Sequence, residues 1–158
     1  MRDMTLEDLH GEVGVEHWLT YADGFRRRIY VVDKEIPFPE GRLIVSQTDP
    51  AGVITTANQS FVAMSGYSED ELIGQQHYIL RHPEMPAVAF KDLWDTIRQG
   101  KKWTGYVKNL RKDGAYYWVF ASVVPNIRNG RIVGYTSVRR KPSRTKVDEC
   151  TALYKTLV

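Results

Sequence analysis

Three kinds of side chain in this sequence could bind a charged, planar ligand. Arg81 and His82 stand side by side ahead of a predicted helix, where a cation can approach a phosphate or another electron-rich group. Asn109 carries an amide, which both donates and accepts hydrogen bonds, as the polar edge of a conjugated ring requires. Phe90, Trp94 and Trp103 are candidates for apolar walls. On residue types alone, a structural role is favoured for each of them, so their position in the fold must decide.

The sequence contains no constellation typical of an enzyme or a metal centre. His77 and His82 are five residues apart, which does not place them on one helical face, and no third metal ligand stands nearby. The serines have no identifiable His and Asp partners for a nucleophilic triad. Neither a G-x-G-x-x-G fingerprint nor a phosphate loop is present. We therefore expect no enzymatic activity, and we expect any bound dinucleotide to be held in a manner other than that of a Rossmann fold.

The bulk composition predicts one soluble domain with tails. The chain has 158 residues, of which 42% are hydrophobic and 26% charged, and its net charge is +3. Such a chain can bury a real core, and its weak positive charge argues against nucleic acid as a partner. The single cysteine, Cys150, excludes an internal disulfide and favours a reducing compartment, so we expect a cytoplasmic location. No stretch is long and apolar enough for a membrane helix, so a membrane anchor would belong to segments absent from this chain.

The elements that must position these side chains follow from residue periodicity. Short strands are predicted at Leu43–Gln47 and Val53–Thr56, joined by a turn. Asn58 is the expected N-cap of the next helix, and Ser68 with Glu71 forms a capping box that opens another. The longest helix of the core is predicted to follow Pro86 and to end before Gly100; it carries Val88, Leu93, Trp94 and Ile97 on one face.

After Gly100 the period changes to that of strands. Three strands are predicted at Trp103–Lys112, Tyr116–Pro125 and Ile132–Arg139, joined by the hairpin signals Asp113-Gly114 and Asn129-Gly130. Asn109 then shares one strand face with Trp103, Gly105 and Val107. Strands and helices that do not alternate as βαβ units predict an α+β fold, with a five-stranded antiparallel sheet and short helices on one face.

The two ends of the chain read differently from this core. Residues 1–40 show helix-compatible patches at Leu6–Leu9 and His17–Tyr21, then a strand-like run at Ile29–Val32, and are interpreted as an N-terminal extension or cap, part of which could derive from an expression tag. Residues 41–142 form the predicted core domain. Residues 143–158 form a predicted amphipathic helix that leads away from this domain, and its apolar stripe requires a partner.

The motifs of the core, in order, resemble those of a known family. They are Ile54–Gly66, Tyr67, Glu71–Gly74, Arg81–Pro86, Ala89-Phe90, Leu93-Trp94, Gly100, Trp103, Gly105, Val107–Asn109, Tyr117–Val119, Pro125, Gly134-Tyr135, Ser137–Arg139 and Leu153–Lys155. From Leu43 to Val158 the chain resembles the PAS domain of bacterial aerotaxis and energy-taxis receptors. It departs from that pattern at Glu84, where the family has Asp, and it lacks the reactive cysteine motif of the light-sensing PAS branch.

The resemblance implies a fold, a cofactor and a role. It implies the PAS fold and bound FAD, whose redox state reports cellular redox conditions or oxygen to a chemotaxis output. The cofactor-binding residues expected from it are Arg81, His82, Glu84, Phe90, Trp94, Trp103 and Asn109. Two alternatives stay open from the residues: a haem-binding gas sensor with His77 or His82 as the proximal ligand, and a ligand-free PAS module for dimerisation.

The resemblance also implies partners outside this chain. The expected partner is a HAMP and chemoreceptor-like signalling region of the full-length receptor, at the cytoplasmic face of the inner membrane. A homodimer is expected through residues 1–40, the C-terminal helix or both, because an apolar helical stripe is costly to leave in water.

Overall fold

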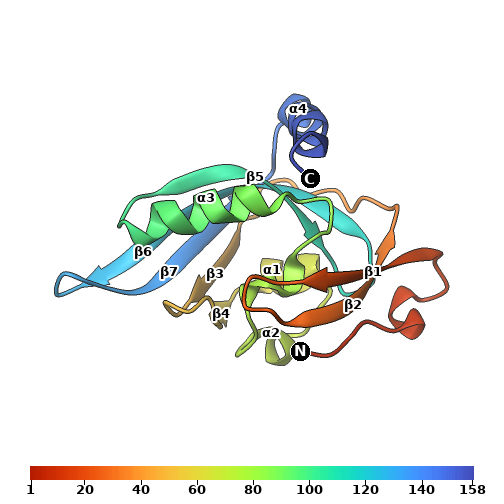
Figure 1. The fold of residues 1–158 in the computed structure, drawn as a ribbon, viewed down its shortest axis with the longest axis horizontal. Helices are drawn as coiled ribbons and strands as arrows, with labels where there is room; N and C mark the ends of the chain where they lie inside the picture. Colours follow the sequence, from red (N-terminus) through yellow and green to blue (C-terminus); the bar gives the residue numbers. More distant parts are fainter.

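Five antiparallel strands form the central sheet of the computed structural model, which describes residues 1–158 (Figure 1). The strands are β3 (Ile44–Thr48), β4 (Ile54–Ala57), β5 (Trp103–Leu110), β6 (Tyr116–Arg128) and β7 (Arg131–Arg140). Their order in the sheet is β4-β3-β7-β6-β5, and all four pairings are antiparallel. The predicted α+β class and five-stranded sheet are confirmed.

The segment between β4 and β5 holds the helices that cover one face of this sheet. They are α1 (Gln59–Ser65), α2 (Glu69–Leu72), the 3₁₀ helix η2 (His77–Leu80) and α3 (Ala87–Arg98). The predicted caps form: the Asn58 side chain accepts from the Phe61 amide at 3.0 Å, and Ser68 and Glu71 make a reciprocal capping box. These caps fix where each short helix begins and hence where η2 and α3 lie over the sheet.

Successive side chains of the long strands point alternately to an inner face, which the helices cover, and to an outer face. Tyr117 and Val119 point inward, where they join Phe61 and Leu72 in a cluster of 18 buried hydrophobic residues. At the far end of the sheet, Asn129 and Gly130 both have positive φ, at 52° and 74°, as a two-residue type I′ turn requires. The pattern of Asn-Gly between two strands thus sets the register of β6 against β7.

The N-terminal residues form a separate two-stranded sheet. Strand β1 (Gly14–Thr20) pairs antiparallel with β2 (Arg26–Val32), after a 3₁₀ helix η1 (Leu6–Leu9). The prediction of helix at His17–Tyr21 is therefore wrong, whereas strand at Ile29–Val32 is confirmed. Strand β1 pairs with β2 over seven residues, which satisfies the backbone hydrogen-bonding groups of His17–Thr20. This long-range pairing stabilises a strand more than the helical spacing of the apolar residues stabilises a helix.

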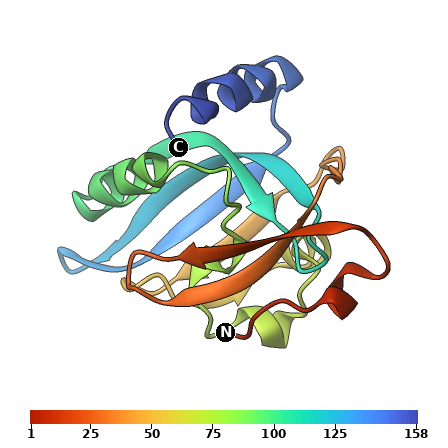
Figure 2. The ribbon, with the colours of Figure 1, turned by 45° about the vertical axis from the view of Figure 1, so that its right-hand side comes forward.

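This N-terminal hairpin packs against the end of the sheet where β5 turns into β6 (Figure 2). Met4, Leu9 and Ile29 bury their side chains together with Leu110 of β5. Gly114, in the β5–β6 turn, has φ +85°, and a Cβ there would lie 2.9 Å from the Tyr30 carbonyl oxygen, so only glycine fits beneath the hairpin.

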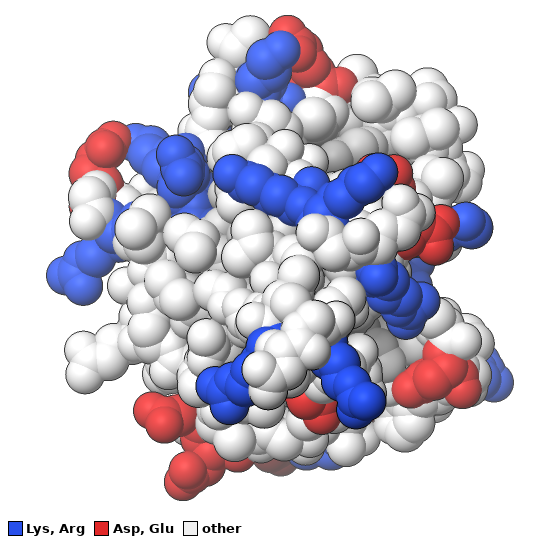
Figure 3. Space-filling model, turned by 90° about the vertical axis from the view of Figure 1, so that its left-hand side faces the viewer, with Lys and Arg blue, Asp and Glu red and all other residues white.

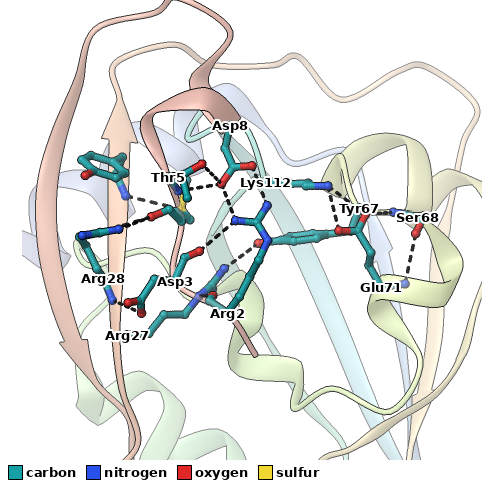
Figure 4. Close-up of polar contacts among 12 residues, drawn as sticks. Arg2, Asp3, Thr5, Asp8, Arg27, Arg28, Tyr67, Ser68, Glu71 and Lys112 are labelled. Carbon is teal, nitrogen blue, oxygen red and sulfur yellow. Dashed lines mark hydrogen bonds and ion pairs between the residues drawn. The ribbon is translucent and has the colours of Figure 1, made fainter.

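A buried arginine ties the hairpin to the helical layer (Figure 4). Arg27 is 2% exposed; its guanidinium donates to the Tyr67 hydroxyl at 3.1 Å, the Ile79 carbonyl at 3.3 Å and the Arg2 carbonyl at 2.7 Å. Arg2 in turn pairs with Asp8 at 2.6 Å. Because these partners come from distant segments, the hairpin is held in one orientation over η2.

The C-terminal helix α4 (Arg144–Lys155) lies on the opposite side of the sheet from α1 and α2 (Figure 1). Tyr154 stacks on Trp118 with ring centroids 6.1 Å apart, and its hydroxyl donates to the Tyr106 carbonyl at 2.6 Å. Part of the predicted apolar stripe therefore finds its partner within the chain, while Leu153 and Leu157 stay exposed. None of the helices has the length and apolar character needed to cross a membrane.

Candidate functional site

A cavity of about 790 Å³ lies between the inner face of the sheet and the helices η2 and α3, with the β1–β2 turn as one wall. The residues that line this cavity include Tyr21, Asp23, Gly52, His77, Tyr78, Arg81, Phe90, Lys91, Trp94, Asp95, Arg98, Val107, Asn109, Tyr135, Ser137 and Arg139. Four of the residues expected to bind a cofactor line this cavity: Arg81, Phe90, Trp94 and Asn109.

Asn109 and Arg81 lie next to each other at the cavity because their backbones form an isolated antiparallel bridge. Asn109 is 6% exposed and shares the inner face of β5 with Val107, as strand alternation predicts. The Arg81 guanidinium lies 5.3 Å from the Phe90 ring centroid, and its Nε is buried without a hydrogen-bond partner. An amide and an unsatisfied cation thus face the same space.

Arg139, which the sequence analysis did not single out, is a buried cation in this cavity. It is 2% exposed, and no carboxylate pairs with it. Its guanidinium donates to Ser46 Oγ at 2.6 Å and to His77 Nε2 at 2.9 Å and lies 4.6 Å from the Phe61 ring centroid. Because burial penalises its charge, the pKa of Arg139 falls to about 10, so the guanidinium is still charged at neutral pH.

The charges around the cavity do not balance. Arg81, Arg98 and Arg139 form no ion pair, whereas the lining carboxylate of Asp95 is neutralised by Lys91 at 2.6 Å and that of Asp23 accepts from the Tyr78 hydroxyl at 2.8 Å. Lys and Arg also cross the middle of the molecular face in Figure 3, while most Asp and Glu lie nearer its margins. An anionic ligand would complete this arrangement.

Unsatisfied donors point to the same conclusion. Five buried side-chain polar atoms in the structure lack a hydrogen-bond partner, and three belong to cavity residues: the Tyr21 hydroxyl, Arg81 Nε and Arg139 Nε. The two arginine Nε atoms can only donate and the Tyr21 hydroxyl can also donate, so acceptor atoms of a ligand would satisfy all three.

Trp94 forms an aromatic wall on the α3 side. Tyr135 meets it edge to face with ring centroids 5.5 Å apart, and the Arg98 guanidinium lies 4.9 Å from its ring centroid. Gly52 lies so close that a Cβ there would stand 3.2 Å from the indole ring. These neighbours fix the indole plane, so it offers a preformed flat surface.

Three of the expected cofactor contacts lie outside the cavity. Trp103 folds its ring across Gly105, where an added Cβ would come within 2.4 Å of the indole, and its Nε1 donates to Asp92 at 2.9 Å. His82 is fully buried, and its Nδ1 accepts from the Glu84 amide. Glu84 pairs with Lys108 at 2.6 Å on the outer side, near Tyr154. We leave these three residues out of the site proposed below.

Both buried histidines are held neutral, and this makes stability depend on pH. Burial, with the neighbouring Arg139 charge, lowers the pKa of His77 to about 3; burial and Lys108 lower the pKa of His82 to about 3. Below about pH 6.5, the usual histidine value, the unfolded chain takes up protons that the folded chain does not. Stability is therefore full above that pH and falls on acidification.

As the pH falls from about 6 to about 4, we expect each of these histidines to lower the free energy of unfolding by up to about 1.4 kcal/mol per pH unit. Urea unfolding at pH 7, 6 and 5 measures the slope. His82→Asn keeps an acceptor in place of Nδ1 and should lower the slope, whereas the exposed control His10→Asn should not. Equal slopes in the two variants would contradict the assignment.

The residues present fit a flavin nucleotide. Such a ligand combines a flat ring, a polar edge that donates and accepts, and an anionic phosphate tail. The cavity offers an aromatic wall at Trp94, an amide at Asn109, and the unneutralised arginines Arg81, Arg98 and Arg139. The single cysteine, Cys150, lies on α4 and does not line the cavity, so a covalent thiol adduct is not available here.

Comparison with known proteins shows the family to which the chain belongs. The PAS fold family matches residues 54–139. The chain is 44% identical over 128 residues to the aerotaxis receptor of Escherichia coli (strain K12), a match that covers 81% of this chain and 25% of the receptor. It is 28% identical over 102 residues to the nitrogen fixation regulatory protein of Klebsiella pneumoniae, covering 64% of this chain and 21% of that protein. The chain thus spans about a quarter or less of these relatives.

Solved structures agree on the fold. The dark structure of the blue-light photoreceptor Aureochrome1 LOV has a TM-score of 0.61 at 28% identity, covering 70% of this chain and 86% of that one. A light-oxygen-voltage domain studied with a flavin analogue has a TM-score of 0.60 at 27% identity, covering 72% of this chain and 84% of that one.

Proposed function

Because the chain belongs to the PAS fold family and is similar over 128 residues to an aerotaxis receptor, we propose that it is a redox- or oxygen-sensing input domain whose cavity binds FAD. The observation that carries the proposal is the set of three cavity arginines without carboxylate partners, of which Arg139 is fully enclosed. A cavity that is positively charged, aromatic-walled and short of acceptors suits an anionic flavin nucleotide.

The residues of the chain have distinct roles in this proposal. Asn109 binds the polar edge of the ring, and Trp94 and Phe90 form its walls. Arg81 and Arg98 bind the phosphates, which two arginines accommodate better as a diphosphate than as a single phosphate. Arg139, held by Ser46 and His77, favours negative charge at the ring. A bound flavin supplies reversible uptake of electrons and protons.

A route from the cavity to the outer face of the sheet runs through β5. Asn109 faces the cavity, while the preceding residue, Lys108, faces outward and pairs with Glu84 beside α4. A change in the charge or hydrogen bonding at Asn109 shifts β5, and with it the surface on which Tyr154 and Trp118 pack. We propose that α4 passes this change to a HAMP and chemoreceptor-like output region of a homodimeric, cytoplasmic receptor. In this proposal the chain itself is a sensor and not an enzyme.

The haem alternative is less well supported by the geometry. His77 faces the cavity, but its Nε2 accepts from Arg139 at 2.9 Å, so that lone pair is occupied and a positive charge lies beside it. His82 lies outside the cavity. Either histidine would have to lose its present environment before it could bind iron.

We expect the purified protein to release FAD on denaturation, with an absorption spectrum of a flavin rather than a Soret band. Chromatography of the released cofactor tests this, after the protein has been supplied with excess FAD, FMN and haem in parallel. FMN alone, haem, or no cofactor would each contradict the proposal. Absence of any ligand would favour the dimerisation module instead.

A further inference from the structure

The N-terminal hairpin lies outside the part of the chain that the family matches, yet it forms part of the cavity. The PAS fold family covers residues 54–139, whereas Thr20, Tyr21, Ala22 and Asp23 of the β1–β2 turn line the space. The hairpin is therefore more than a cover for the sheet edge. Its turn brings side chains of its own to the site.

Tyr21 is the residue of this turn that has an unexplained polar atom. The side chain is 3% exposed, and its hydroxyl is buried without a partner. The ring stacks on Tyr78 with centroids 4.0 Å apart and planes 9° from parallel, so its apolar faces are satisfied while the hydroxyl is not. A buried, unpaired donor on a cavity wall indicates a ligand acceptor.

The same wall contains a second donor in the same condition. Arg81 Nε is buried and unpartnered, and the guanidinium has no carboxylate. Tyr21 and Arg81 line the same cavity. A neutral hydroxyl donor beside an unpaired guanidinium is a combination that suits a phosphate oxygen.

The position of Tyr21 is fixed before any ligand binds. Its backbone closes the turn through bonds with Phe25 and Gly24, each 2.9 Å long. Tyr78 is held by its bond to Asp23, and Arg27 anchors the hairpin to the Ile79 carbonyl, two residues before Arg81. Little ordering is left for the ligand to impose, which favours tight binding.

We propose that Tyr21 is a ligand-binding residue, whose hydroxyl donates to a phosphate of the bound flavin nucleotide beside Arg81, and that the hairpin thereby extends the binding site beyond the PAS core. The inference rests on the proposed flavin function. We assign the phosphate rather than the ring to Tyr21 because Asn109 and Arg139 of the sheet already offer polar groups for the ring.

The test compares the affinities of riboflavin, FMN and FAD for wild type and Tyr21→Phe. Riboflavin has the ring without phosphate, so the three ligands separate the two contacts. We expect Tyr21→Phe to weaken FAD about tenfold or more, because a hydrogen bond to a charged acceptor is lost, and to leave riboflavin within about twofold. A loss for FAD but not for FMN would support the inference and assign the second phosphate.

A matched control is Tyr106→Phe, which removes a hydroxyl on the outer face of β5. It should change none of the three affinities. Thermal melting gives an independent readout: the rise in melting temperature caused by FAD should be smaller in Tyr21→Phe than in wild type.

Two results would overturn the inference while leaving the flavin proposal intact. One is equal weakening of all three ligands, which would place the hydroxyl at the ring; the other is unchanged FAD affinity in Tyr21→Phe. If wild type binds no flavin at all, the proposed function fails first, and the inference fails with it.

Discussion

Replacing Arg139 by Met should lower the two-electron reduction potential of the bound flavin by roughly 30 to 60 mV, which corresponds to one to two decades in the affinity difference between the reduced and oxidised forms. Arg139 is a charged side chain, 2% exposed and free of any carboxylate, so its charge is little screened. A reduced flavin carries more negative charge than an oxidised one, and the guanidinium stabilises it selectively. Met has a similar length and no charge, and so removes that preference.

Spectroscopic redox titration measures the change, with flavin in excess to keep the site filled. Arg140→Met is the matched control, since Arg140 is the next residue of β7, is exposed on the outer face and stacks over Phe120. Arg139→Lys keeps the charge but cannot reproduce the paired bonds to Ser46 and His77, and should fall between wild type and Arg139→Met. Identical potentials in Arg139→Met and Arg140→Met would remove Arg139 from the redox site.

Replacing Asn109 by Leu should weaken flavin binding by about one to two decades. The amide can donate to one atom of the polar ring edge and accept from another, whereas Leu leaves that edge unpaired at a cost of about 1 to 3 kcal/mol. The strand itself should persist, because Leu suits a buried sheet position next to Val107.

The variant is compared with wild type by bound flavin per folded protein and by thermal melting with and without FAD. Thr104→Leu is the appropriate control because Thr104 is exposed on the same strand. Lys112, although nearby in sequence, pairs with Glu71 at 2.8 Å, so changing it would disturb the α2 contact. Full occupancy and unchanged affinity in Asn109→Leu would show that Asn109 is an ordinary strand residue.

The local elements were predictable from sequence because their signals are local. Asn58 and Ser68 cap the helices that they were expected to cap, and Asn129-Gly130 makes the expected turn. Alternation along β5 likewise sufficed to put Asn109 on the inner face of the sheet. In each case the deciding interaction joins residues that are close in sequence or follows from a fixed period.

The N-terminal hairpin was not predictable in the same way. His17–Tyr21 has apolar residues at spacings that also suit a helix, and only the pairing of β1 with β2 selects the strand. The contact of this hairpin with the cavity depends on long-range bonds, such as that from Arg27 to the Ile79 carbonyl. No local pattern reports such a bond.

The sequence by itself determined the PAS fold and four of the residues that line the cavity, Arg81, Phe90, Trp94 and Asn109, because motif order and strand period encode them. Only the tertiary structure decided the rest. It turned Trp103 onto Gly105, buried Arg139 against Ser46, and brought Tyr21, which lies outside residues 54–139, to the cavity that Arg81 also lines. Whether a cation is paired or a hydroxyl satisfied depends on neighbours that are distant in sequence, and these emerge when the sheet, α3 and the hairpin close around one space.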